Sequence, residues 1–105
     1  MIEKKILRFC IENKRLSWLK HALIRMFERD IGKDEVKMTL LKGVVIEEYN
    51  DDKPYPSFLM LHVNSESKPL HVVASLDTSK QWCYIITAYR PDSTYFEDDY
   101  KTRKQ

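Results

Sequence analysis

The sequence has only two glycines and two cysteines. Neither Gly32 nor Gly43 belongs to a glycine-rich motif, which excludes a phosphate-binding loop of the nucleotide-binding kind. Cys10 and Cys83 each stand alone, without a second cysteine at the spacing of zinc ligands. We therefore expect reduced and mostly buried thiols, and neither a zinc site nor a disulfide framework.

The sequence also lacks a long hydrophobic run. The stretch from Met1 to Phe9 is too charged to be the apolar part of a signal peptide, and no segment has the length of a membrane-spanning helix. With 105 residues, of which 43% are hydrophobic and 32% charged, the composition is that of one globular domain and not of a disordered chain. We expect a single cytoplasmic domain over residues 1–105, with no membrane partner.

The net charge of +2 is unevenly distributed. Residues 1–42 hold 11 Lys and Arg against 6 Asp and Glu, a balance of +5, whereas residues 43–80 hold 3 against 6, a balance of −3. A basic N-terminal half can offer a phosphate-binding face to nucleic acid. An ordinary solvated helix surface explains the same charges, and charge alone favours that simpler explanation.

Apolar residues at helical spacing predict helices at about residues 2–13, 18–29 and 34–42. Ser17 is placed to cap the second of these helices at its N-terminus. Gly43 is placed to end the third.

In the second predicted helix, His21, Arg25 and Arg29 follow one another at intervals of four and therefore share one face. A bound phosphate would relieve the repulsion between them, as would the carboxylate of Glu28 or of a more distant residue. His21 could act as a general base, although a structural role is the commoner use of a histidine at such a position.

From Val44 onward the apolar pattern changes to the period of two that is typical of strands. We predict strands at 44–49 and 57–63, and two more within 69–91 on either side of a polar turn. Residues 50–56 contain two prolines and two aspartates and predict a loop.

The short connections favour an antiparallel meander. The predicted fold is therefore α+β, with two or three N-terminal helices packed on one face of a four-stranded antiparallel β-sheet. We expect a short C-terminal helical tail in which Tyr95, Phe96 and Tyr100 hold the tail against the domain.

Polar residues in the strand regions are candidates for a site, because buried polar groups need either partners or a function. His71 begins a strand among apolar neighbours, and it is either a satisfied structural histidine or a group that projects into a cleft. Tyr89 and Arg90 end the next strand and could position a phosphate, or they could be a core-edge ring and a solvated charge. Glu47 or Glu48 could supply a carboxylate base, although solvent exposure of both is the simpler expectation.

The three histidines, His21, His62 and His71, are scattered and do not form a metal-binding motif. No nucleophile motif occurs either. If the protein is an enzyme, acid–base and electrostatic catalysis without a metal or cofactor suits these residues best.

Several segments together resemble the DUF4258 family of small prokaryotic proteins. The resemblance covers about residues 18–100 in the family's order and spacing, and the combination is far more specific than any one piece. The chain departs from the pattern at Asp30, where a glycine is expected, and at Tyr95-Phe96, where a tryptophan often stands. The matching positions are His21-Ala22, Arg25, Arg29, Ile31, Gly43, residues 46–49, Asp51-Asp52-Lys53-Pro54-Tyr55-Pro56-Ser57, Pro69-Leu70-His71-Val72-Val73 and residues 85–92.

This family is similar to the RelE-like and barnase-like toxin ribonucleases, in which helices precede an antiparallel sheet. The resemblance implies the toxin of a toxin–antitoxin pair, with an RNA substrate and an MqsA-like antitoxin as partner. In such a metal-independent endoribonuclease, His21 and His71 would serve as acid and base in an order that stays open, and Tyr89 would position or stack on a base. Arg25 and Arg29, with Arg90 beside Tyr89, would hold phosphate.

A non-catalytic protein-binding module of the same fold is the alternative hypothesis. It would bind a partner through an exposed sheet edge or a groove, and its histidines would be structural. The weak overall positive charge supports this alternative, and the oligomeric state stays open.

Overall fold

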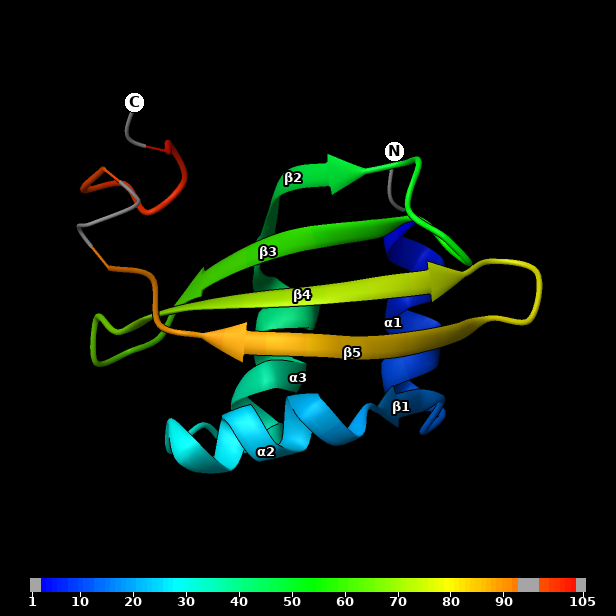
Figure 1. Ribbon diagram of the computed structural model, residues 1–105, viewed down its shortest axis with the longest axis horizontal. Helices are drawn as coiled ribbons and strands as arrows, with labels where there is room; N and C mark the ends of the chain where they lie inside the picture. The colour runs from blue at the N-terminus through cyan, green and yellow to red at the C-terminus, as the bar shows by residue number, and fades with distance from the viewer. Residues whose placement is uncertain (1–2, 93–96, 104–105) are drawn as a thin grey trace.

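The computed structural model describes residues 3–92 and 97–103. Within these ranges the strands form one five-stranded sheet in the order β1-β5-β4-β3-β2 (Figure 1). Strands β2 to β5 form an antiparallel meander, and β1 pairs with β5 in parallel. The elements are α1 (Lys4–Glu12), β1 (Leu16–Trp18), α2 (Lys20–Glu28), α3 (Lys33–Lys42), β2 (Val44–Tyr49), β3 (Ser57–Val63), β4 (Pro69–Asp77) and β5 (Trp82–Tyr89).

The predicted α+β class fits, but the prediction of a four-stranded antiparallel sheet is wrong. The sheet has a fifth strand, β1, which pairs in parallel with Cys83–Ile85 of β5. Three residues are too few to show a period of two, and their apolar side chains merge with the helical pattern that follows. Ser17 consequently lies in this strand, and Leu19 occupies the position that precedes α2.

The predicted C-terminal helix is not found where the chain is described. Residues 97–103 form turns and bends with one isolated bridge residue, and no helix. Tyr95 and Phe96, on which the prediction also rested, lie outside the described residues.

Two of the helices cover one face of the sheet. Helices α1 and α3 lie against this face, and α2 runs along β5 at the sheet edge (Figure 1). Alternate strand residues point toward these helices and form the core with them, among them Phe58, Val72 and the buried thiol of Cys83. Cys10 of α1 is also fully buried in this core, and both thiols are free.

Gly43 ends α3, as the sequence predicts. Its backbone has a negative φ of −77°, so conformational freedom is not what requires glycine here. A Cβ atom at this position would lie 2.4 Å from the carbonyl oxygen of Thr39 and 2.6 Å from that of Leu61. The absence of a side chain therefore allows the end of α3 to approach β3 closely.

The second face of the sheet carries the side chains that alternate with those of the core. The register places Glu47 of β2 opposite Leu59 of β3. His71 of β4 stands between Leu61 of β3 and Tyr89 of β5. Polar side chains from three strands are thus brought to one region of this face.

No helix among the described residues is long and apolar enough to cross a membrane.

Candidate functional site

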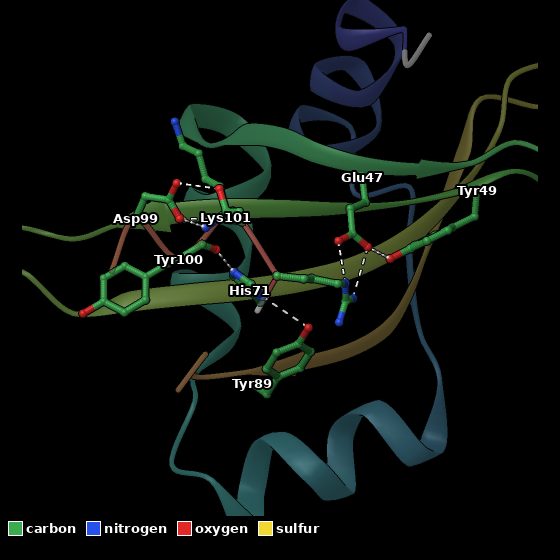
Figure 2. Close-up of polar contacts among 9 residues, drawn as sticks. Glu47, Tyr49, His71, Tyr89, Asp99, Tyr100 and Lys101 are labelled. Atoms are coloured by element: carbon green, nitrogen blue, oxygen red, sulfur yellow. Dashed lines mark hydrogen bonds and ion pairs between the residues drawn. The ribbon is translucent and has the colours of Figure 1, made fainter. Parts of the chain in front are cut away.

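The imidazole of His71 is fully buried on the second face and has a partner at each ring nitrogen. Figure 2 shows the ring between the hydroxyl of Tyr89 and the backbone of Tyr100, which belongs to the C-terminal segment 97–103. Nδ1 lies 3.2 Å from the Tyr89 hydroxyl oxygen, and Nε2 lies 2.7 Å from the Tyr100 carbonyl oxygen. Because a carbonyl only accepts, the neutral ring carries its proton on Nε2 and accepts the Tyr89 hydroxyl proton at Nδ1.

Burial lowers the pKa of His71, because the charged imidazolium is poorly solvated in this position. The hydrogen bond to the Tyr100 carbonyl raises this pKa, the positive charge of Arg103 lowers it, and the negative charge of Glu47 raises it. The net direction is downward, so the ring is held in its neutral form. Arg103 and Glu47 thus act on the imidazole with opposite signs.

Glu47 is the second ionisable group of this region. Its carboxylate accepts hydrogen bonds from Arg103, with Nε at 2.7 Å and Nη2 at 3.1 Å, and from the hydroxyl of Tyr49 (Figure 2). These contacts, above all those of Arg103, lower the pKa of Glu47. Glu48 stands opposite Phe58, so it belongs to the other side of the sheet. Of the two strand glutamates considered from the sequence, Glu47 is the one that faces His71.

The segment 97–103 covers this group of residues. Tyr100 supplies the carbonyl that contacts His71, and Arg103 supplies the guanidinium that pairs with Glu47. The segment itself is organised by Asp99, whose carboxylate accepts hydrogen bonds from the backbone of Lys101 and Thr102. Sequence reasoning missed Arg103, because 56 residues separate it from Glu47 and no local pattern marks such a pair.

The remaining predicted residues are distributed along α2 and at the end of β5. Arg29 donates a hydrogen bond to the carbonyl of Ala88 at 2.9 Å, beside Tyr89. Burial raises the pKa of Tyr89, and the positive charge of Arg29 is among the charges that act on its hydroxyl. Arg29 therefore lies beside Tyr89, and its role as a phosphate-binding cation stays a prediction.

His21 and Arg25 lie farther from this region. Both are exposed, and Arg25 is paired with Glu28 at 3.0 Å on the surface of α2. His21 is two helical turns from Arg29, about 12 Å along the axis. His21 and Arg25 belong to α2, whereas Arg29 follows the helix as its C-cap residue and reaches the end of β5 through its hydrogen bond to Ala88.

Arg90 makes a structural contact. Its guanidinium forms a two-pronged ion pair with Glu35 of α3, in which Nη2 lies 2.9 Å from Oε1 and Nη1 contacts Oε2. Nη1 also donates to the carbonyl of Pro69 at 3.2 Å. These bonds join α3 to the beginning of β4 and to the chain that follows β5.

Replacing Arg90 by methionine should lower the free energy of unfolding by about 1–2 kcal/mol, because a partly buried carboxylate and a carbonyl lose their donor. Arg25→Met is the matched control, since its exposed pair with Glu28 contributes at most about 0.5 kcal/mol. Urea unfolding followed by circular dichroism measures both. Equal stability of the two variants would contradict a structural role for Arg90.

The described part of the chain contains no group of three or more His, Cys, Asp or Glu side chains placed to hold a metal ion. What it offers instead is a carboxylate, an imidazole, a phenol and two guanidinium groups on neighbouring elements. Such a set can transfer protons and stabilise an anion.

No curated protein and no solved structure matches the chain. The similarity to RelE-like and barnase-like ribonucleases is thus not confirmed and stays an expectation. A family model described as "Domain of unknown function (DUF4258)" matches residues 18–90, which is more than half of the chain. This match confirms the family resemblance seen in the sequence, and the protein belongs to the DUF4258 family.

Proposed function

We propose that this protein is a metal-independent endoribonuclease, the toxin of a toxin–antitoxin pair, which acts in the cytoplasm. The observation that carries the proposal is the gathering of Glu47, His71, Tyr89 and Arg29 at one end of the second face of the sheet. An MqsA-like antitoxin is the partner that the family resemblance suggests.

Cleavage of RNA without a metal needs a base, an acid and a cation. The base removes the proton of a ribose 2′-hydroxyl, whose oxygen then bonds to the adjacent phosphorus. The bond from phosphorus to the 5′-oxygen breaks, and the acid gives that oxygen a proton. The products are a 2′,3′-cyclic phosphate and a free 5′-hydroxyl, and a cation stabilises the extra negative charge of the transition state.

Glu47 and His71 are suitably placed to serve the two sides of one phosphate. Strand β3 separates their strands and the two residues are offset by two positions in register, so their backbones lie about 12 Å apart, and both side chains extend over the second face. The guanidinium of Arg103 pairs with Glu47 and acts electrostatically on His71. A phosphodiester that took the place of this guanidinium would lie between the carboxylate and the imidazole.

The ordinary pKa values of the two groups, together with the effect of a bound phosphate on them, favour Glu47 as the base and His71 as the acid. Arg103 lowers the pKa of Glu47, and burial, assisted by Arg103, lowers that of His71. An RNA phosphate in place of Arg103 exchanges a positive neighbour for a negative one, which raises both values. Imidazole is the group whose ordinary pKa is nearer neutrality, so His71 is the one that would carry a proton.

Tyr89 and Arg29 complete the proposed site. The Tyr89 hydroxyl fixes the orientation of the His71 ring through Nδ1, which leaves Nε2 to face the substrate. Arg29 lies beside Tyr89 and can hold a phosphate of the bound strand. Under this proposal the segment 97–103 must move away before RNA can reach His71, since the Tyr100 carbonyl occupies Nε2.

The proposal is tested by incubating the purified protein with end-labelled single-stranded RNA in EDTA. We expect cleavage, with cyclic or 3′-phosphate ends on the products. Translating ribosomes with a labelled messenger provide the second substrate. Absence of cleavage on both substrates would contradict the proposal.

A protein-binding module is the second candidate, and the burial of His71 is the observation that favours it. A histidine with no exposed surface and a partner at each ring nitrogen has what a structural residue requires. If neither RNA substrate is cleaved, this candidate gains support. It then predicts that substitutions of Glu47 alter stability alone.

A further inference from the structure

A pocket lies on the same face of the sheet as His71, farther along the strands. Its volume is about 550 Å³, which is within the range of sites for small organic molecules. It opens between the 50–56 loop, the beginning of β3 and the middle of β5. Its lining includes Asp52, Tyr55, Ser57, Ser75, Tyr84 and Ile86.

A stacked pair of tyrosine rings lines this pocket. The rings of Tyr55 and Tyr84 are stacked, with centroids 5.5 Å apart and planes inclined by 5°. The nearby carboxylate of Asp77 is fixed by hydrogen bonds from the backbone and hydroxyl of Ser79 and from the backbone of Lys80. Asp77 raises the pKa of the Tyr55 hydroxyl, so this ring stays neutral. A planar apolar ligand can extend the stack.

Hydrogen-bonding groups stand beside the tyrosine rings. The hydroxyl of Ser57 donates a hydrogen bond to Oδ2 of Asp52. Among the described residues, this hydroxyl contacts one of the two oxygens of the Asp52 carboxylate. A carboxylate accepts hydrogen bonds and cannot donate them, so it selects a ligand edge that carries N–H groups. Lys53, at the same rim, supplies a positive charge for a phosphate.

These features together describe a ligand with flat apolar faces, N–H donors along one edge and a nearby negative charge. A nucleobase on a single-stranded RNA has all three. Guanine suits a carboxylate best, because its Watson–Crick edge presents two adjacent N–H donors.

The pocket also lies at a useful distance from the proposed cleavage site. Ser75 and His71 are four residues apart on β4, about 13 Å along the strand, and their side chains point to the same face. A short single-stranded segment can span this distance along the sheet.

We infer that the pocket of Asp52, Tyr55 and Tyr84 binds a base, preferentially guanine, of the RNA strand whose backbone passes His71. The inference rests on the proposed ribonuclease function for its choice of ligand.

The test measures binding separately from cleavage. The probes are fluorescent 2′-O-methyl oligonucleotides, uridine-only or with one guanosine, which cannot be cleaved because they lack a free 2′-hydroxyl. Fluorescence anisotropy should show tighter binding of the guanosine probe. Tyr55→Ala should weaken that binding by about 5- to 100-fold, the usual effect of losing one stacking partner. Tyr55→Phe, which keeps the ring, should bind as the unchanged protein does.

Asp52→Asn should abolish the preference for guanosine while leaving the protein folded, since residue 52 is exposed. Equal binding by the unchanged protein and Tyr55→Ala, or a guanosine preference that survives Asp52→Asn, would overturn the inference. Failure of the unchanged protein to bind either probe would overturn it as well.

The two proposals can fail independently in these experiments. Cleavage of RNA combined with indifference to Tyr55→Ala would retain the ribonuclease and reject the pocket. Binding that depends on Tyr55, without cleavage by the unchanged protein, would retain the pocket as an RNA-binding site and reject the ribonuclease.

Discussion

The His71→Ala protein should cleave single-stranded RNA about 10²- to 10⁴-fold more slowly than the unchanged protein, the usual effect of losing a general acid or base. The imidazole is the group of the site that can give a proton to the leaving 5′-oxygen near neutral pH. Initial rates on an end-labelled RNA in EDTA measure the effect. Both proteins are purified by the same procedure, so that a contaminating nuclease would reveal itself as equal cleavage.

His21→Ala is the matched control for this experiment. His21 is exposed on α2 and remote from Tyr89, so the proposed geometry gives it no part in the reaction, and its variant should retain full activity. Removing a buried ring at position 71 also leaves a cavity. His71→Gln, which keeps a polar side chain there, should be equally inactive and should unfold cooperatively in urea. Full activity of a folded position-71 variant would remove His71 from the mechanism.

A protein that ends at Asp92 should cleave RNA faster than the full chain, by about 10- to 30-fold. Truncation removes the hydrogen bond between the Tyr100 carbonyl and His71, about 1 kcal/mol, and the exposed ion pair between Arg103 and Glu47, about 0.5–1 kcal/mol. If these two contacts hold the segment 97–103 over His71, their loss increases the fraction of molecules in which RNA can reach His71. The increase is about 10- to 30-fold, the factor that corresponds to the summed free energies.

Two single substitutions make this second experiment specific. Arg103→Ala should raise the rate by about 2- to 5-fold, because it removes the ion pair with Glu47 and leaves the hydrogen bond between His71 and the Tyr100 carbonyl in place. Lys101→Ala should have no effect, since Lys101 contributes only its backbone to the described hydrogen bonds. A truncated protein that is folded but inactive would show that residues after Asp92 form part of the site.

Nuclear magnetic resonance gives a second readout that does not depend on activity. Burial is the main cause that lowers the pKa of His71, and the segment 97–103 contributes to that burial. Truncation removes this burial and the positive charge of Arg103, which both lower the pKa, and it removes the Tyr100 hydrogen bond, which raises the pKa. Because burial is the largest of the three causes, the pKa should move upward, toward the ordinary value for histidine. An unchanged histidine titration in the truncated protein would contradict the covering role of the segment.

Much of the fold could be predicted from local patterns. Strands β2 and β3 have the predicted bounds, because these largely apolar stretches of six and seven residues are flanked by Gly43, by the proline-containing loop 50–56 and by the turn that begins at Asn64. Strand β1 could not be predicted, since its three residues become a strand only by pairing with β5. That pairing depends on the three-dimensional fold, and no local pattern around Leu16 predicts it.

The sequence could indicate the residues of the candidate site that lie in strands, but not those of the C-terminal segment. His71 was a candidate because it is a polar residue within an apolar strand, and Tyr89 because it ends the next strand. Their position opposite each other comes from the register of β4 and β5 in the structure. Its partners Tyr100 and Arg103 come from a segment without periodicity, so no pattern could place them. The spacing of His21, Arg25 and Arg29 predicted that they lie on one side of a helix. It did not predict which of them contacts the sheet.

The two buried thiols give a way to observe motion between α1 and the sheet. Burial raises the pKa of Cys83 to about 12 and also raises that of Cys10, so both groups are protonated and unreactive while the core is closed. An alkylating reagent can reach them only during excursions that separate α1 from β5. The rate of alkylation at each cysteine, measured by mass spectrometry, therefore reports how often this layer opens and whether the opening is local or global.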